Sequence, residues 1–183
     1  MSKRHHQTQR DEAARQRRRT APGAPPGTLK TDPDAPRPRI SVIAYSNQEF
    51  VEQELRNPSE LSAFLGQYPV TWINIDGLGD AQVLHEIGEI FHIHPLALED
   101  VINVHQRAKL EHYPDHQFLV FHQVDQSRGI QSEQISLFLG SNFVLTFQEE
   151  IGDCFEGMRE RMRQHVGLIR QSGPDYLAYS ILD

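Results

Sequence analysis

Three side chains that could bind a metal ion through oxygen stand close together in the middle of the chain: Glu99, Asp100 and Asn103. They belong to the segment 94–103, which has the pattern of a short helix. Pro95 suits the first helical position, where its missing N–H would have no partner, and the apolar residues fall on the opposite side from the three polar ones. Carboxylate and amide oxygens are ligands for Mg²⁺ or Ca²⁺ rather than for softer metals. The competing interpretation is an acidic helix face that only contacts solvent.

A second group of possible metal ligands consists of His85, Glu89 and His92, which would share one face of a helix capped by Asp80. Their i, i+4, i+7 spacing would suit a transition metal. The metalloprotease signature is not present, because Glu89 occupies the position of its second histidine. Ordinary surface residues explain this group as well, and we favour that interpretation.

The motifs of common soluble enzymes are absent from the sequence: GxGxxG, the P-loop, the nucleophile elbow and HExxH do not occur. Cys154 is the single cysteine, which excludes an internal disulfide, and a lone cysteine without an activating base is more often inert than catalytic. Glu99 and Asp100 are adjacent, so on a helix their side chains would point about 100° apart and would rarely converge on one substrate. We therefore expect no enzymatic activity and no small organic substrate.

The net charge of −7 combines a basic N-terminal part with an acidic remainder. Residues 1–39 hold ten of the 18 Lys and Arg but four of the 25 acidic residues, so the rest carries eight basic and 21 acidic side chains, a net charge of −13. Residues 1–38 are rich in proline and poor in apolar residues, which predicts a disordered basic tail. Residues 39–183 are then one domain.

The Arg-rich tail leaves open a soluble nucleic-acid-binding or cation-binding protein, and contact with anionic lipid is a further option. A solubilising extension with no specific partner explains the tail equally well. The acidic domain should repel nucleic acid and attract cations. We therefore expect no nucleic-acid partner.

The remaining segments predict a mixed order of strands and helices. Residues 70–76 are apolar on both faces, as is typical of a central strand, and residues 140–142 predict a hairpin turn, so the sheet is at least partly antiparallel. We predict an α+β fold in which a mixed, partly antiparallel sheet has helices on both faces, an αβα sandwich that ends in the start of a long helix. The other expected strands are 40–45, 118–124, 134–139, 143–147 and a short one within 108–116. Helices are expected at 80–91, at 94–103, from Asp153 to Ile169 and from Pro174 onward.

Several segments resemble, in the same order, the CorA family of magnesium and cobalt transport proteins. The cytoplasmic domain of that family carries a segment like HPLALEDVLN followed by HQRPK, which corresponds here to residues 94–103 and 105–109. The sequence departs from the family at Ala108, where proline is usual, and at His116. Further matching segments are 133–140, 142–149, 158–161 and 175–180.

The resemblance implies a domain on the cytoplasmic side of a transport protein of the inner cell membrane. In the family, five such domains form a ring, and cations bound between neighbours hold the pore shut. Carboxylates at the positions of Asp100 and Glu99 supply part of the cation site, and Asp183 matches a further acidic position. The implied ion is Mg²⁺ or Co²⁺, and the related zinc transporters are the alternative. No stretch is long and apolar enough to span a bilayer, so we expect a chain truncated before the family's long helix and membrane spans.

Overall fold

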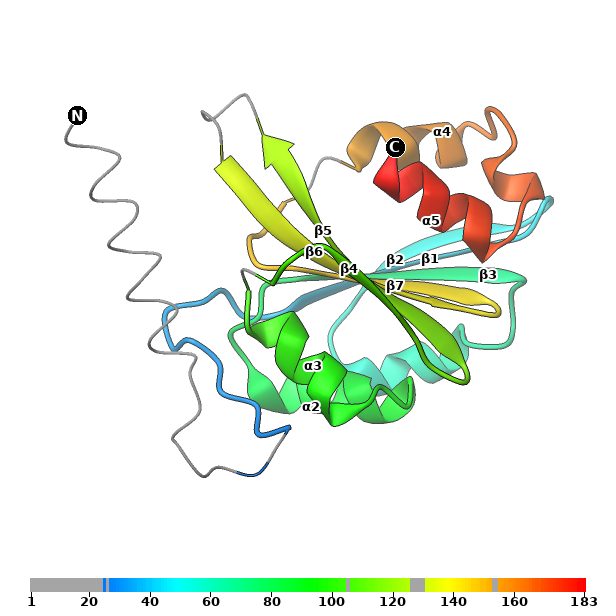
Figure 1. Ribbon diagram of the computed structural model, residues 1–183. Coiled ribbons are helices and arrows are strands. Elements are labelled where there is room, and N and C mark those ends of the chain that lie inside the picture. The colour runs from blue at the N-terminus through cyan, green and yellow to red at the C-terminus, as the bar shows by residue number, and fades with distance from the viewer. Residues whose placement is uncertain (1–24, 26, 105, 126–130, 153–154) are drawn as a thin grey trace.

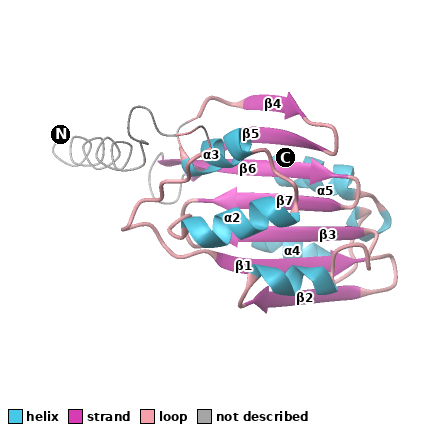
Figure 2. Ribbon diagram, turned by 90° about the horizontal axis from the view of Figure 1, so that it is seen from below, coloured by secondary structure: helices cyan, strands magenta, loops and turns pink. Residues whose placement is uncertain are grey.

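The computed structural model describes residue 25 and residues 27–104, 106–125, 131–152 and 155–183. These residues form one seven-stranded mixed sheet with helices on both faces (Figure 1, Figure 2). The strand order is β2-β1-β3-β7-β6-β5-β4. The strands are β1 (Arg39–Tyr45), β2 (Phe50–Leu55), β3 (Val70–Asp76), β4 (Lys109–His112), β5 (His116–Asp125), β6 (Gln131–Gly140) and β7 (Phe143–Gln148). The helices are η1 (Pro58–Ala63), α2 (Ala81–Ile90), α3 (Pro95–Ile102), α4 (Glu156–Arg163), η2 (Ile169–Gln171) and α5 (Pro174–Leu182).

The centre of the sheet contains β3 and β7, the one parallel pair among the described strands. All seven residues of β3 are buried, as expected for a segment that is apolar on both faces. The other pairs are antiparallel, and β4 to β7 follow one another as neighbouring strands. The predicted α+β fold with a mixed, partly antiparallel sheet is therefore confirmed.

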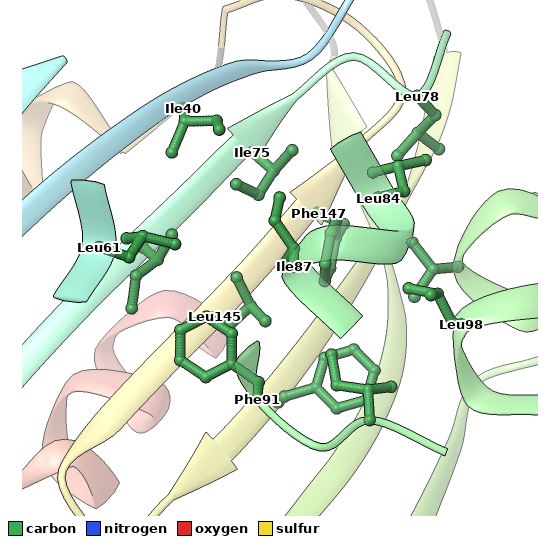
Figure 3. Close-up of a cluster of buried hydrophobic side chains, with 14 of the residues drawn as sticks. Ile40, Leu61, Ile75, Leu78, Leu84, Ile87, Phe91, Leu98, Leu145 and Phe147 are labelled. Carbon is green, nitrogen blue, oxygen red and sulfur yellow. The ribbon is translucent and has the colours of Figure 1, made fainter. Parts of the chain in front are cut away.

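One face of the sheet is covered by η1, α2 and α3 (Figure 1). Their apolar side chains form one core cluster with alternate residues of the strands, and Figure 3 shows Ile87 of α2 and Leu98 of α3 within it. Gly88 lets the two helices approach closely, because a Cβ atom there would lie 2.7 Å from Cδ2 of Leu98. We call this side of the sheet the α3 face.

The opposite side, the α5 face, is covered by α4, η2 and α5 (Figure 1). Trp72 of β3 and the buried Met158 and Met162 of α4 belong to its core cluster. Leu177 and Ile181 of α5 complete the contact with the sheet. The helices on this side are short, and α5 occupies nine residues.

Two details differ from the sequence prediction. The helix expected to continue to Ile169 ends at Arg163, because the chain turns sharply with positive φ angles at His165 (55°) and Gly167 (79°). Val166 therefore leaves the predicted apolar stripe and is 51 % exposed. Strand β2 was not predicted at all.

The described part of the N-terminal region lies against the domain. Leu29 packs on the core of the α3 face, and the backbone N–H of Gly79 donates to the carbonyl of Pro36 at 2.8 Å. Cys154 and residues 1–24 of the predicted tail lie outside the described residues, and the boundary between tail and domain stays a prediction. None of the helices formed by the described residues has the length and apolar character needed to cross a membrane.

Candidate functional site

Helix α3 forms as its sequence predicts and turns its polar residues outward. Pro95 stands at its first position, and Nδ1 of His94 accepts the backbone N–H of Leu96 at 3.2 Å. Four apolar residues of the helix are buried against the core. Glu99 and Asp100 are consequently half-buried at the outer side of α3, and the backbone N–H of Asn103 closes the helix by donating to the Glu99 carbonyl at 2.8 Å.

The carboxylate of Glu99 contacts the N-terminal segment. Its Oε2 atom accepts the backbone N–H of Gly27 at 3.1 Å. Gly27 has a φ of 82°, and a Cβ atom at this position would lie 2.5 Å from Cβ of Pro95. Only a residue without a side chain can therefore approach α3 closely enough to place its N–H on Glu99.

The carboxylate of Asp100 is paired with a cation of its own chain. Nζ of Lys109 lies 2.6 Å from Oδ2 of Asp100 and 2.7 Å from Oε1 of Glu111, and the hydroxyl of Tyr113 donates to Oε2 of Glu111 at 3.0 Å. Lys109 and Glu111 are alternate residues of β4, so they point to the same side of the sheet. Asp100 thus belongs to a four-residue polar network that ties α3 to the edge strand.

The contacts of the network shift the pKa values of Lys109, Glu111 and Tyr113. Burial works to lower the pKa of Lys109, but the hydrogen bonds to Asp100 and Glu111 outweigh burial and raise it. The hydrogen bond from Lys109 lowers the pKa of Glu111. Burial and the hydrogen bond to Glu111 raise the pKa of Tyr113. The ammonium group therefore stays charged between two carboxylates.

Gln134 of β6 supports the backbone of the same region. It is buried, its Nε2 group donates to the Asp100 carbonyl at 3.3 Å, and its Oε1 atom accepts the backbone N–H of Gln106 at 2.7 Å. Sequence reasoning did not identify Gln134, Lys109 or Glu111 as parts of the site. The alternation of Lys109 and Glu111 in a short strand was a usable signal, whereas nothing in the sequence connects Gln134 with α3.

Asp183 lies apart from the other two predicted ligands. It follows α5, so it stands on the α5 face, whereas Glu99 and Asp100 stand on the α3 face (Figure 1). One chain therefore does not bring the three carboxylates together. A site that uses all three needs more than one copy of the chain, and the role of Asp183 stays a prediction.

The histidine group proposed as an alternative is not assembled. Helix α2 ends at Ile90, and His92 follows it with a φ of 51°, so His92 does not continue the helical face of His85 and Glu89. All three side chains are exposed. Within the described ranges, no three His, Cys, Asp or Glu residues are grouped so that they could hold a metal ion. The expectation that these three residues share one helical face was therefore wrong for His92.

Comparison with protein families decides what kind of protein carries this helix. Residues 69–183, which include α3, β4 and Asp183, match the model of the CorA-like Mg²⁺ transporter protein family. The chain belongs to this family. It is 42 % identical over 168 residues to the cobalt/magnesium transport protein CorA of Thermotoga maritima, which covers 88 % of this chain and 47 % of that protein. The putative metal ion transporter YfjQ of Bacillus subtilis is 31 % identical over 112 residues, 61 % of this chain and 34 % of that protein.

Two solved structures of transport-related proteins share the fold. The complete CorA magnesium transporter from Methanocaldococcus jannaschii superposes with a TM-score of 0.57 and 15 % identity over 78 % of this chain and 43 % of that chain. The ZntB cytoplasmic domain from Vibrio parahaemolyticus gives 0.50 and 9 % identity over 70 % of this chain and 51 % of that chain. Our chain thus spans less than half the length of the curated CorA-like relatives it matches. Those relatives are named as transporters and not as enzymes.

Proposed function

We propose that residues 39–183 are the divalent-cation-sensing domain of a CorA-like transport protein, with residues 1–38 as a basic extension. The observation that carries the proposal is the position of two adjacent carboxylates, Glu99 and Asp100, on the outer side of α3. The net charge of −13 beyond residue 39 supports it, because such a surface attracts cations. We also propose that the domain lies on the cytoplasmic side of the inner membrane and has no enzymatic activity.

The carboxylates fit a hard divalent cation in part. Mg²⁺ usually takes one or two carboxylates and retains several waters in an octahedral shell, and Glu99 and Asp100 offer that type of oxygen. Two side chains leave most of the shell to water and to ligands from elsewhere. We propose Mg²⁺ as the ion and Co²⁺ as the second candidate, since the Thermotoga relative is named for both. No feature of the described residues favours Zn²⁺.

The remaining ligands would come from a neighbouring copy of the domain. Copies of a domain with this charge repel one another. A cation shared between the acidic side of α3 on one copy and carboxylates such as Asp183 on the next reduces that repulsion and favours a closed assembly. Its effect on the assembly equals the difference in its affinity for the closed and open arrangements. We propose a pentamer within a membrane-spanning protein as that assembly.

Sedimentation of the purified chain with and without millimolar Mg²⁺ tests the proposal. The variants are Asp100→Asn, which keeps the side-chain shape, and Asp115→Asn, which removes the same charge at an exposed residue outside α3. We expect Mg²⁺ to raise the sedimentation coefficient or the melting temperature of the native chain and of Asp115→Asn, and to do so far less for Asp100→Asn. An Asp100→Asn variant that responds like the native chain would remove Asp100 from the site.

A further inference from the structure

The carboxylate of Asp100 already has a positively charged partner within its own chain. Lys109 lies 2.6 Å from it, with the two side chains 25 % and 28 % exposed. An ammonium group and a divalent cation bind the same oxygen atoms, so each weakens the binding of the other. We propose that Lys109 is a built-in competitor for the cation at Asp100, which sets the ion concentration at which the domain responds. This inference rests on the proposed role of Asp100 as a cation ligand.

The fold holds the ammonium group in place. Lys109 begins β4, where it pairs with Val120 of β5, and its Nζ atom lies 5.1 Å from the ring centre of Phe118 on that same strand. Because the chain holds Lys109 beside Asp100, its ammonium group has an effective concentration there in the millimolar range or above. Dissolved monovalent ions do not have such an advantage. Lys109 is therefore a competitor of fixed strength, set by the packing of α3 on β4 and β5.

Glu111 gives the ammonium group a second position. It lies 2.7 Å from Nζ of Lys109, and Tyr113 holds its other oxygen. When a divalent cation takes over Asp100, Lys109 keeps one carboxylate partner and no half-buried charge is left without a counter-ion, which would be strongly unfavourable. Glu111 thus makes the exchange of Lys109 for the metal ion possible.

This arrangement predicts opposite effects for two variants of one contact. Lys109→Met removes the competitor, so the apparent affinity for Mg²⁺ rises because Asp100 is free in every molecule. Glu111→Gln removes the second carboxylate partner of Lys109, so Lys109 stays on Asp100 and the apparent affinity for Mg²⁺ falls. If Glu111 acts through Lys109, the double variant behaves like Lys109→Met. If it acts only by its own charge, the two effects add.

The experiment is a calorimetric Mg²⁺ titration of the purified chain at constant ionic strength, supported by melting temperatures at each Mg²⁺ concentration. We expect Lys109→Met to lower the apparent dissociation constant by about five-fold or more, and Glu111→Gln to raise it. Lys109→Arg keeps the charge and should stay near the native value. Arg56→Met removes one positive charge from an exposed residue of another region and should also stay near it. Melting temperatures without Mg²⁺ show whether each variant is folded.

Each result separates the competitor from the site itself. Mg²⁺ binding that Asp100→Asn abolishes but Lys109→Met leaves unchanged overturns the role of Lys109 and keeps the proposed function. An equal gain in Arg56→Met also overturns it, because general charge would then explain the effect. Binding that appears only in Lys109→Met supports both. Binding in neither the native chain nor Lys109→Met overturns the cation site and the competitor together.

Discussion

The two helical layers of the domain are attached to the sheet by different combinations of contacts. On the α3 face, α2 and α3 join the larger apolar core, with Gly88 in direct reach of Leu98. On the α5 face, α4 adds charged contacts to the apolar packing of its buried Met158 and Met162. Arg163 donates from two nitrogens to the two carboxylate oxygens of Glu52 on β2, at 2.7 Å each, and the guanidinium of Arg159 lies 5.0 Å from the ring centre of Trp72.

The difference indicates what each layer can do. A helix that is fixed by close apolar packing offers a stable base for a cation site, because its outward carboxylates move little relative to the strands beneath. The ion pairs of α4 are partly exposed, so this part of its attachment weakens with salt and the helix detaches more easily. We therefore expect the α3 face to control global stability and the α4 region to open locally.

The largest effect should follow from a cavity in the core of the α3 face. Ile87→Ala removes a fully buried side chain of α2, and we expect the free energy of unfolding to fall by about 2–5 kcal/mol. Met158→Ala, at the rim of the other core with 6 % exposure, should have a smaller effect because its surroundings can close over the gap more easily. Urea unfolding followed by circular dichroism measures both values.

A surface residue of the same layer provides the control for this pair. Leu96 of α3 is 48 % exposed, so Leu96→Ala should change the free energy of unfolding by less than about 0.5 kcal/mol. Equal losses in Ile87→Ala and Met158→Ala would contradict the ranking of the two faces.

The sequence indicated the core of the fold more reliably than its edges. The segment at β3 is apolar on both sides, so its central position followed from its composition. Strand β2 was missed because its exposed residues Glu52, Gln53 and Glu54 leave little apolar pattern, which an edge strand can tolerate. Helix α4 was predicted too long because the apolar spacing continues past Arg163, whereas the chain turns at His165 and Gly167, which both have positive φ angles.

The candidate site was predictable only at the level of one helix. The polar side of α3 followed from its 3.6-residue period and from Pro95, and the resemblance to CorA proteins suggested its role. The ion pair of Asp100 with Lys109 depends on how α3 packs on β4, and the contact of Glu99 with Gly27 depends on where the N-terminal segment crosses the helix. Local patterns do not encode either contact.

A smaller effect should follow from loss of the ion pairs of α4. Arg163→Met removes the bond to Glu52 and those to Glu156 and Glu160, and we expect a loss of about 1 kcal/mol at low salt that shrinks in about 1 M NaCl. Hydrogen exchange should become faster in the amides of α4 and remain unchanged in α2. Arg161→Met is the matched control, since Arg161 is exposed and makes no ion pair with the described residues. A loss independent of salt would mean that Arg163 acts through packing alone.

The smallest effects concern the pH at which each face begins to weaken. Burial lowers the pKa of His116, a residue 7 % exposed on the α3 face, below its ordinary 6.5. On the other face, the hydrogen bond from Arg163 lowers the pKa of Glu52 below 4.5. Both groups take up a proton more readily in the unfolded chain. The stabilisation that each group contributes is therefore complete above its ordinary pKa. It is lost as the pH falls toward the pKa of the group in the folded chain.

The stability of the α3 face should consequently fall below about pH 6.5. The ion pair between Arg163 of α4 and Glu52 should weaken only below about pH 4.5. Melting temperatures between pH 8 and pH 3 test this order in His116→Phe and Glu52→Gln. Relative to the native chain, His116→Phe should have a flatter profile in the upper window alone, and Glu52→Gln in the lower window alone. If His116→Phe keeps the native slope between pH 6.5 and pH 5, the imidazole is solvated in solution. The α3 face would then lack the pH response that distinguishes it from the ion-paired side.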